Sequence, residues 1–185
     1  MIDWGNFSGF FTTGLPSAVL YTSLSVSVMA IVMGLANKCV NNKTRFVLWV
    51  LLIEYLFVLI CSTVICRDAI SFEFDRLELS PLWTYSAVIH HTPGVSVWDI
   101  VLNVVLFVPL GLLIKMIYPK ISVWRIVFIG LVCSVFIEAN QFLFEKGAAQ
   151  SDDVMHNTLG AVIGWMIAKG IHILKTILKK EQHCQ

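Results

Sequence analysis

Five long apolar runs constrain this chain more than any other feature. They cover residues 17–36, 46–66, 97–118, 124–144 and 154–174. A helix of about 20 residues crosses the roughly 30 Å hydrocarbon core of a bilayer, at 1.5 Å per residue. Hydrophobic residues make up 57% of the chain and the mean hydropathy is +0.80, which is more apolar surface than a soluble domain of this size buries. We therefore predict an all-α integral membrane protein with about five transmembrane helices.

The positively charged residues predict the orientation of these helices. Counting the ends of the runs, ten of the 13 lysines and arginines lie after the first run, around the end of the third run or towards the C-terminus. Cytoplasmic segments of membrane proteins carry such an excess, so we expect the N-terminus outside and the C-terminus in the cytoplasm. The expected organisation is a pair of helices in residues 1–66, an outer loop in 67–96, a core of three helices in 97–174 and a cytoplasmic tail in 175–185.

An acidic residue interrupts the fourth run, in the stretch VCSVFIEANQFLF. Glu138 follows Ser134 by four residues and precedes Gln141 by three, so the three side chains share one helical face. Glu138 would lie about 9 Å below the outer end of its helix. A charged side chain at membrane depth costs about 3 kcal/mol or more, and such residues usually line a cavity or a pathway.

The third and fifth runs place polar residues at a similar depth. Asn103 lies about 9 Å below the outer end of the third run, with Asp99 one turn above it. The fifth run begins with further polar residues, among them His156. We expect one outward-facing pocket, with Arg76 of the outer loop at its mouth. Its predicted binding residues are Arg76, Asn103, Glu138, Gln141, Asp152, Asp153 and Asn157.

A structural interpretation of the same residues stands beside the pocket. A protonated Glu138 that hydrogen-bonds Asn103 or Asn157 would join helices, at about 0.6 kcal/mol per bond. Gly160 and Gly164 form a small-xxx-small step, which predicts a neighbouring helix in close contact. Pro109 predicts a kink in the third run, because proline leaves the carbonyl four residues earlier without its usual donor.

Other kinds of site have no sequence support. His90 and His91 are adjacent, but no HxxxH or HExxH spacing accompanies them, and no P-loop or dinucleotide fingerprint is present. The five cysteines have no metal-binding spacing. We expect no metal, no cofactor, no structural disulfide and no nucleic-acid partner.

Three stretches carry a resemblance to a known family. They are NVVLFVPLG (103–111), SVFIEANQ (134–141) and DDVMHNTLGAVIG (152–164), with RLELSPLW (76–83) as a weaker fourth. In their order and spacing they resemble the VanZ-like family of small bacterial membrane proteins. Two departures stand out: Glu78 and Leu82 occupy positions where the family often has asparagine and phenylalanine, and EKGAAQS lacks the arginine and the first aspartate that usually precede the aspartate pair. The resemblance implies a multi-pass protein of the bacterial cytoplasmic membrane and low-level resistance to the lipoglycopeptide teicoplanin.

Three hypotheses for the function remain open at this point. In the first, the pocket binds a membrane lipid, a lipid-linked cell-wall precursor or a lipoglycopeptide. In the second, the protein is an intramembrane enzyme that acts on a lipid head group, with Glu138 or Asp153 as the acid–base, because burial raises the pKa of a carboxyl into a useful range. In the third, the chain is a scaffold for envelope enzymes, and the polar cluster only holds helices together.

Overall fold

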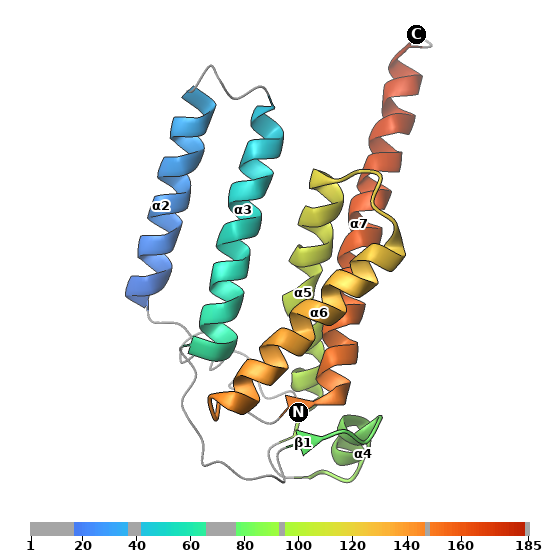
Figure 1. Ribbon diagram of the computed structural model, residues 1–185. Helices are drawn as coiled ribbons and strands as arrows, with labels where there is room; N and C mark the ends of the chain where they lie inside the picture. The colour runs from blue at the N-terminus through green and yellow to red at the C-terminus, as the bar shows by residue number, and fades with distance from the viewer. Residues whose placement is uncertain (1–16, 37–41, 66–76, 93–94, 147–148, 184–185) are drawn as a thin grey trace.

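The computed structural model describes residues 17–36, 42–65, 77–92, 95–146 and 149–183, which form an all-helical membrane protein (Figure 1). Four helical segments are long and apolar enough to cross a membrane, and a shorter apolar helix, Leu20–Leu35, lies beside them. The prediction of about five membrane helices is therefore confirmed. The helices are α2 (Ser17–Ala36), α3 (Lys43–Ile60), the π-helical turn η1 (Cys61–Ile65), α4 (Trp83–Ile89), α5 (Val97–Ile117), α6 (Val123–Leu143) and α7 (Ser151–His183).

The structure differs from the sequence prediction in two places. Helix α7 continues to His183 instead of ending near residue 174, because no glycine or proline follows Gly170 to stop it and the last turns contain good helix formers such as lysine and leucine. The outer loop also contains regular structure: α4 and the two-residue strand β1 (Leu77–Glu78). Strand β1 pairs in parallel with β2 (Ala149–Gln150), which directly precedes α7.

The closest helix contact joins α5 to α7. A Cβ atom added to Gly160 would lie 2.1 Å from the Val104 carbonyl oxygen, and one added to Gly164 would lie 1.9 Å from that of Val108. From the α5 side, a Cβ atom on Gly111 would meet the Ala161 carbonyl oxygen at 1.7 Å. Only glycine allows the two backbones to approach this closely. The close contact predicted from Gly160 and Gly164 is thus confirmed, and α5 is the partner.

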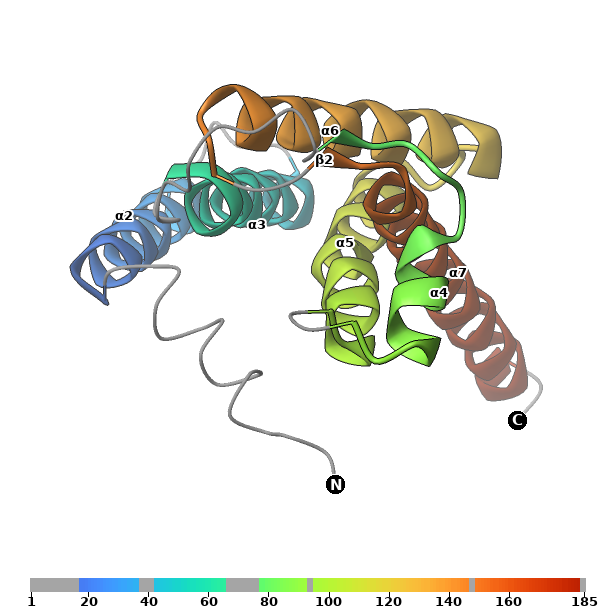
Figure 2. The ribbon, with the colours of Figure 1, turned by 90° about the horizontal axis from the view of Figure 1, so that it is seen from below.

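Helix α6 runs obliquely across the other membrane helices (Figure 2). Its buried side chains form one stripe. They are Ile126, Gly130, Ser134, Ile137, Glu138 and Gln141. The prediction that Ser134, Glu138 and Gln141 share a face is confirmed, and that face is turned towards protein rather than lipid.

Helices α3 and α2 pack beside the three helices α5, α6 and α7. The Tyr55 hydroxyl of α3 donates a hydrogen bond of 2.5 Å to the Leu106 carbonyl oxygen of α5, next to the carbonyl that Pro109 leaves without its usual donor. Helix α2 packs mainly against α3. There the Ser27 hydroxyl donates to the Glu54 carboxylate at 2.7 Å.

Candidate functional site

One end of the helix bundle is covered by the loop that contains β1 and α4, at the bottom of Figure 1. Strand pairing fixes this loop in register, with Leu77 opposite Ala149 and Glu78 opposite Gln150. The positive-inside prediction places this end outside the cell, and we call it the outer end. Arg76, the predicted residue at the mouth of the pocket, lies outside the described residues.

Asp152 holds the loop onto α7. Its side chain is 2% exposed, and its two carboxylate oxygens each accept a backbone hydrogen bond of 2.8 Å, from Leu82 and from Thr84. Leu82 has φ 64°, a left-handed conformation that costs a side chain of this type about 1 kcal/mol or more. The buried carboxylate offsets that cost because it satisfies N–H groups at the start of α4. Asp152 therefore positions the loop.

A second contact between α4 and α7 joins Tyr85 to His156. The Tyr85 hydroxyl lies 2.8 Å from His156 Nε2, and the two rings meet edge to face at a centroid distance of 5.5 Å. The other ring nitrogen of His156 lies 4.0 Å from the Asp153 carboxylate, whose side chain is 21% exposed. This row of residues leads from the surface of the outer end to the buried face of α7.

Glu138 reaches the same region from α6. It is 7% exposed, and its carboxylate accepts a hydrogen bond of 3.3 Å from the backbone N–H of Gln150. One turn away, the Asn157 amide donates to the Ser134 hydroxyl at 2.8 Å, so α6 and α7 are joined by a buried polar pair. Glu138 and Asn157 are thus both buried at the contact of α6 with α7.

Buried polar atoms without partners gather at this end. Among the residues that the structure describes, five buried side-chain atoms have no hydrogen-bond partner, and four of them lie on α4 and the first two turns of α7. These four are Thr84 Oγ1, Ser151 Oγ, His156 Nδ1 and Asn157 Oδ1. Buried polar groups are nearly always hydrogen-bonded in proteins, so these four atoms are the polar groups of the outer end that the described side chains leave unsatisfied.

Three other predicted polar residues have separate positions. The Gln141 amide donates a 3.0 Å hydrogen bond to the Thr63 carbonyl oxygen of η1, so Gln141 fastens the outer end of α3 to α6. Asp99 belongs to the capping box of α5, where its carboxylate accepts from the Ser96 N–H at 2.6 Å. Asn103 is half-buried on α5.

Glu78, which departs from the family pattern, forms part of a turn. Its carboxylate accepts a 2.8 Å hydrogen bond from the Ser80 N–H, an interaction that an asparagine side chain also makes in turns. Hydrogen bonding from Ser80 lowers the pKa of the Glu78 carboxyl below its usual value, because these bonds favour the charged form. Glu78 therefore makes a turn contact that is also open to an asparagine.

Sequence reasoning missed several residues of the outer end and one in mid-membrane. Thr84 and Tyr85 lie in the loop, where no periodicity distinguishes one polar residue from the next. Glu54 carried a usable signal, since it stands alone in the apolar run of α3, as Glu138 does in α6. One of its carboxylate oxygens is bonded to Ser27 and the other is buried without a partner.

Metal binding has no geometric support within the described part of the chain, where no group of three histidine, cysteine, aspartate or glutamate side chains is placed to hold an ion. His90 and His91 are exposed there.

The chain has recognisable relatives among known proteins. The model of the VanZ/LLP1 family matches residues 46–175, which run from α3 to α7 and leave out α2. A 62-residue segment is 37% identical to Protein VanZ of Enterococcus faecium. That match covers 34% of this chain and 38% of the length of the relative. No solved structure matches the chain.

Proposed function

Because this chain belongs to the VanZ/LLP1 family, we propose that it works in the bacterial cytoplasmic membrane and binds an amphiphilic envelope molecule at its outer end. The ligand class is a membrane lipid, a lipid-linked cell-wall precursor or a lipoglycopeptide. Binding there confers low-level resistance of the teicoplanin type. The proposal extends a property of the family to this chain. The segment that matches Protein VanZ of Enterococcus faecium covers 38% of the length of that relative.

The observation that carries the proposal is the cluster of four unpartnered polar atoms at the outer end. It offers two hydroxyls, an imidazole nitrogen and an amide oxygen, which suit a head group that contains hydroxyls and amides. Sugars and peptides have these groups, whereas a simple hydrocarbon does not. The acidic neighbours Glu138 and Asp152 are already bonded to backbone N–H groups, so we assign them to the framework of the pocket.

The depth of the site favours a ligand with an acyl tail. Each buried CH₂ contributes about 0.8 kcal/mol to membrane partitioning, so an acylated glycopeptide concentrates in the outer leaflet. The lipid-linked precursor is displayed on the same surface. A pocket at this depth meets either molecule by lateral diffusion and has less access to a drug that acts from solution.

The test compares one glycopeptide scaffold with and without its acyl chain. Wild type, Glu138→Ala and Asn157→Leu are expressed at matched levels in a sensitive Gram-positive host, and growth inhibition is measured. We expect wild type to protect more strongly against the acylated form, and both variants to lose that difference. Glu54→Gln is the matched control, because it alters a membrane carboxyl outside the outer end. Equal protection by wild type against both forms contradicts the proposal.

A second candidate function draws on the row formed by Asp153, His156 and Tyr85. A carboxylate beside one nitrogen of a histidine and a hydroxyl bonded to the other is an arrangement that can transfer a proton. It favours an intramembrane enzyme that acts on a lipid head group. Asp153→Asn separates this candidate from binding, since a carboxylate that takes part in proton transfer does not tolerate the amide, whereas a binding residue tolerates it better than alanine. If the protein is only a scaffold, the substitutions should lower the amount of protein in the membrane, and protection should not change at matched protein levels.

A further inference from the structure

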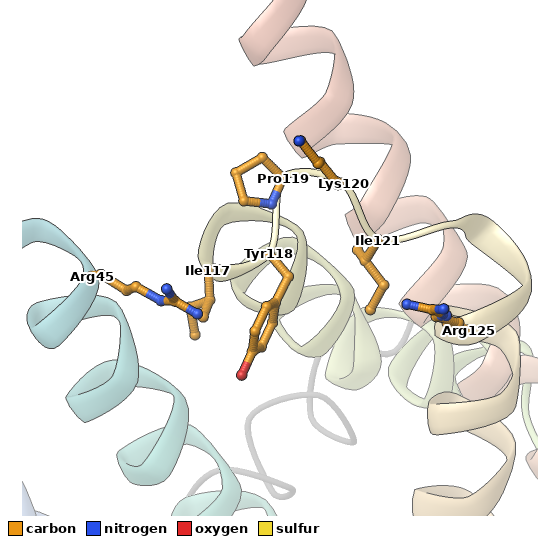
Figure 3. Close-up of a pocket in the computed structure, with 7 residues that line it drawn as sticks. All are labelled: Arg45, Ile117, Tyr118, Pro119, Lys120, Ile121 and Arg125. Carbon is orange, nitrogen blue, oxygen red and sulfur yellow. The ribbon is translucent and has the colours of Figure 1, made fainter.

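A cavity of about 450 Å³ opens at the end of the molecule opposite to the outer site. It lies between the first turn of α3 and the turn that joins α5 to α6 (Figure 3). Helix α5 connects the two ends, so they are about 30 Å apart at 1.5 Å per residue. The positive-inside prediction places this cavity, which we call the inner pocket, at the cytoplasmic surface of the membrane.

The inner pocket is cationic. Arg45 reaches it from α3, Lys120 from the turn and Arg125 from α6. None of the seven residues that line it is acidic, and residues 100–137, which contain the whole turn, include no aspartate or glutamate. Among the residues that the structure describes, none of the three cations forms an ion pair with a carboxylate.

The interactions at this end separate structural cations from the pocket cations. Lys115 donates to the Pro119 carbonyl oxygen at 2.6 Å and its ammonium lies 5.0 Å from the Trp165 ring centroid, so it stabilises the turn. The Arg45 guanidinium lies 5.1 Å from the Tyr118 ring centroid. That distance is typical of a cation–π contact, which holds the Arg45 side chain beside the turn.

The base of the inner pocket is apolar. Ile117 is 3% exposed and belongs to the hydrophobic core, and Ile121 is packed against that core. Trp124, just beyond the turn, is 77% exposed, as tryptophans at the membrane–water interface commonly are. A volume of this size lies within the range of ligand-binding cavities. The combination of cations, an apolar base and an interfacial position fits a molecule that is part anion and part hydrocarbon.

We propose that the inner pocket binds the phosphate of an anionic phospholipid from the inner leaflet. Two guanidiniums provide paired N–H donors for phosphate oxygens, and the lysine adds a third positive charge. Basic pockets between helices on the cytoplasmic side of membrane proteins recognise head groups in this way. The phosphate joins α3 to the α5–α6 turn, two elements that the outer site does not connect. This site is independent of the function proposed for the outer end.

The test uses the full-length protein in neutral detergent, titrated with short-chain phosphatidylglycerol and followed by native mass spectrometry and thermal unfolding. We expect saturable binding to wild type, and affinity reduced about tenfold or more in Arg45→Gln/Arg125→Gln, because two charge-assisted contacts are lost. Lys175→Gln/Lys179→Gln is the matched control: it removes two exposed charges from α7, away from the pocket, and should bind as wild type does.

Two further arms identify the source of the phosphate. Phosphatidylcholine tests whether net negative charge is required, and inorganic phosphate tests whether the tail is required. Millimolar inorganic phosphate should neither displace the lipid nor stabilise the protein. Equal binding of phosphatidylglycerol by wild type and the double arginine variant overturns the proposal, and so does arginine-dependent binding of inorganic phosphate as tight as that of the lipid. If the double variant fails to fold, Lys120→Gln and Arg45→Lys replace it, each with an expected loss of affinity that an unchanged value would contradict.

Discussion

The two ends of this protein use charge in opposite ways. At the outer end, Asp152 and Glu138 are buried and bonded to backbone N–H groups of the covering loop and of β2. At the inner end, Arg45, Lys120 and Arg125 are exposed around an open cavity. The difference follows from side-chain length. Aspartate and glutamate are too short to reach water from a buried position and must be satisfied within the chain, whereas lysine and arginine extend to the interface and keep their charge available.

The comparison teaches that polarity alone does not mark a binding residue. The strongest polar feature of the sequence, the aspartate pair at the start of α7, includes a carboxylate whose two oxygens are both occupied. The buried atoms without a hydrogen-bond partner at the outer end belong to less conspicuous residues such as Thr84 and Ser151. At the inner end, the charges that line the cavity belong to residues that no sequence motif singles out.

The largest expected effect is an all-or-none difference in labelling between the two ends. Single cysteines at Asn42 and Ser80, in a cysteine-free background, should react with a membrane-impermeant reagent from opposite sides. Ser80 should label in intact cells and Asn42 only after permeabilisation. Labelling of both positions from the same side would remove the inner and outer assignments and the depth argument with them.

The next effect concerns the anchor of the outer loop. Asp152→Ala should lower the free energy of unfolding by about 3 kcal/mol or more, because it leaves two backbone N–H groups without their charged acceptor. Asp152→Asn, which keeps one oxygen, should fall between alanine and wild type. Thermal unfolding in detergent measures the loss, and proteolysis within residues 77–92 should accelerate in parallel. Asp153→Asn, at the partly exposed neighbour, serves as the control. Stability of Asp152→Ala equal to that of the control would contradict the anchoring role.

A smaller effect is expected from the contact between α5 and α7, which supports both ends. Gly164→Ala places a methyl group 1.9 Å from the Val108 carbonyl oxygen, so the helices must separate, at a cost of about 1–3 kcal/mol. Gly170→Ala is the matched control on the same helix, because nothing lies within 4 Å of an added Cβ there. It should stabilise the helix by roughly 0.5–1 kcal/mol. Unfolding temperatures that move in the same direction for both variants would argue against the close contact.

The smallest effect belongs to the buried pair between Ser134 and Asn157. A double-mutant cycle with Ser134→Ala and Asn157→Leu should give a coupling energy of about 0.6 kcal/mol, the average for such bonds in membranes. The measurement is unfolding in detergent for the wild type, the two single variants and the double variant. A coupling above about 2 kcal/mol, beyond the range of these bonds, would mean that the pair supports the fold and is not chiefly a part of the ligand site.

The amino-acid sequence by itself determined the long apolar helices and several of the faces they bury, but not the end of α7 or the presence of α4. A long apolar run that crosses a bilayer forms an α-helix, because every backbone polar group must be hydrogen-bonded within the segment. The spacing of Ser134, Glu138 and Gln141 was sufficient to predict their common buried face, and Gly160 with Gly164 was sufficient to predict a close neighbour. These are local or periodic properties, and they can be read from neighbours in the chain.

Tertiary structure alone decided which partners those residues find. Asp152 accepts hydrogen bonds from residues that lie 68 and 70 positions earlier, and Gln141 donates to one that lies 78 positions earlier. No periodicity relates such distant positions, because their contact depends on how separate helices and loops pack together. The inner pocket likewise exists only because the first turn of α3 lies beside the α5–α6 turn. The positions of charged and apolar residues can be read from the sequence. Whether a polar atom has a hydrogen-bond partner depends on how the helices pack.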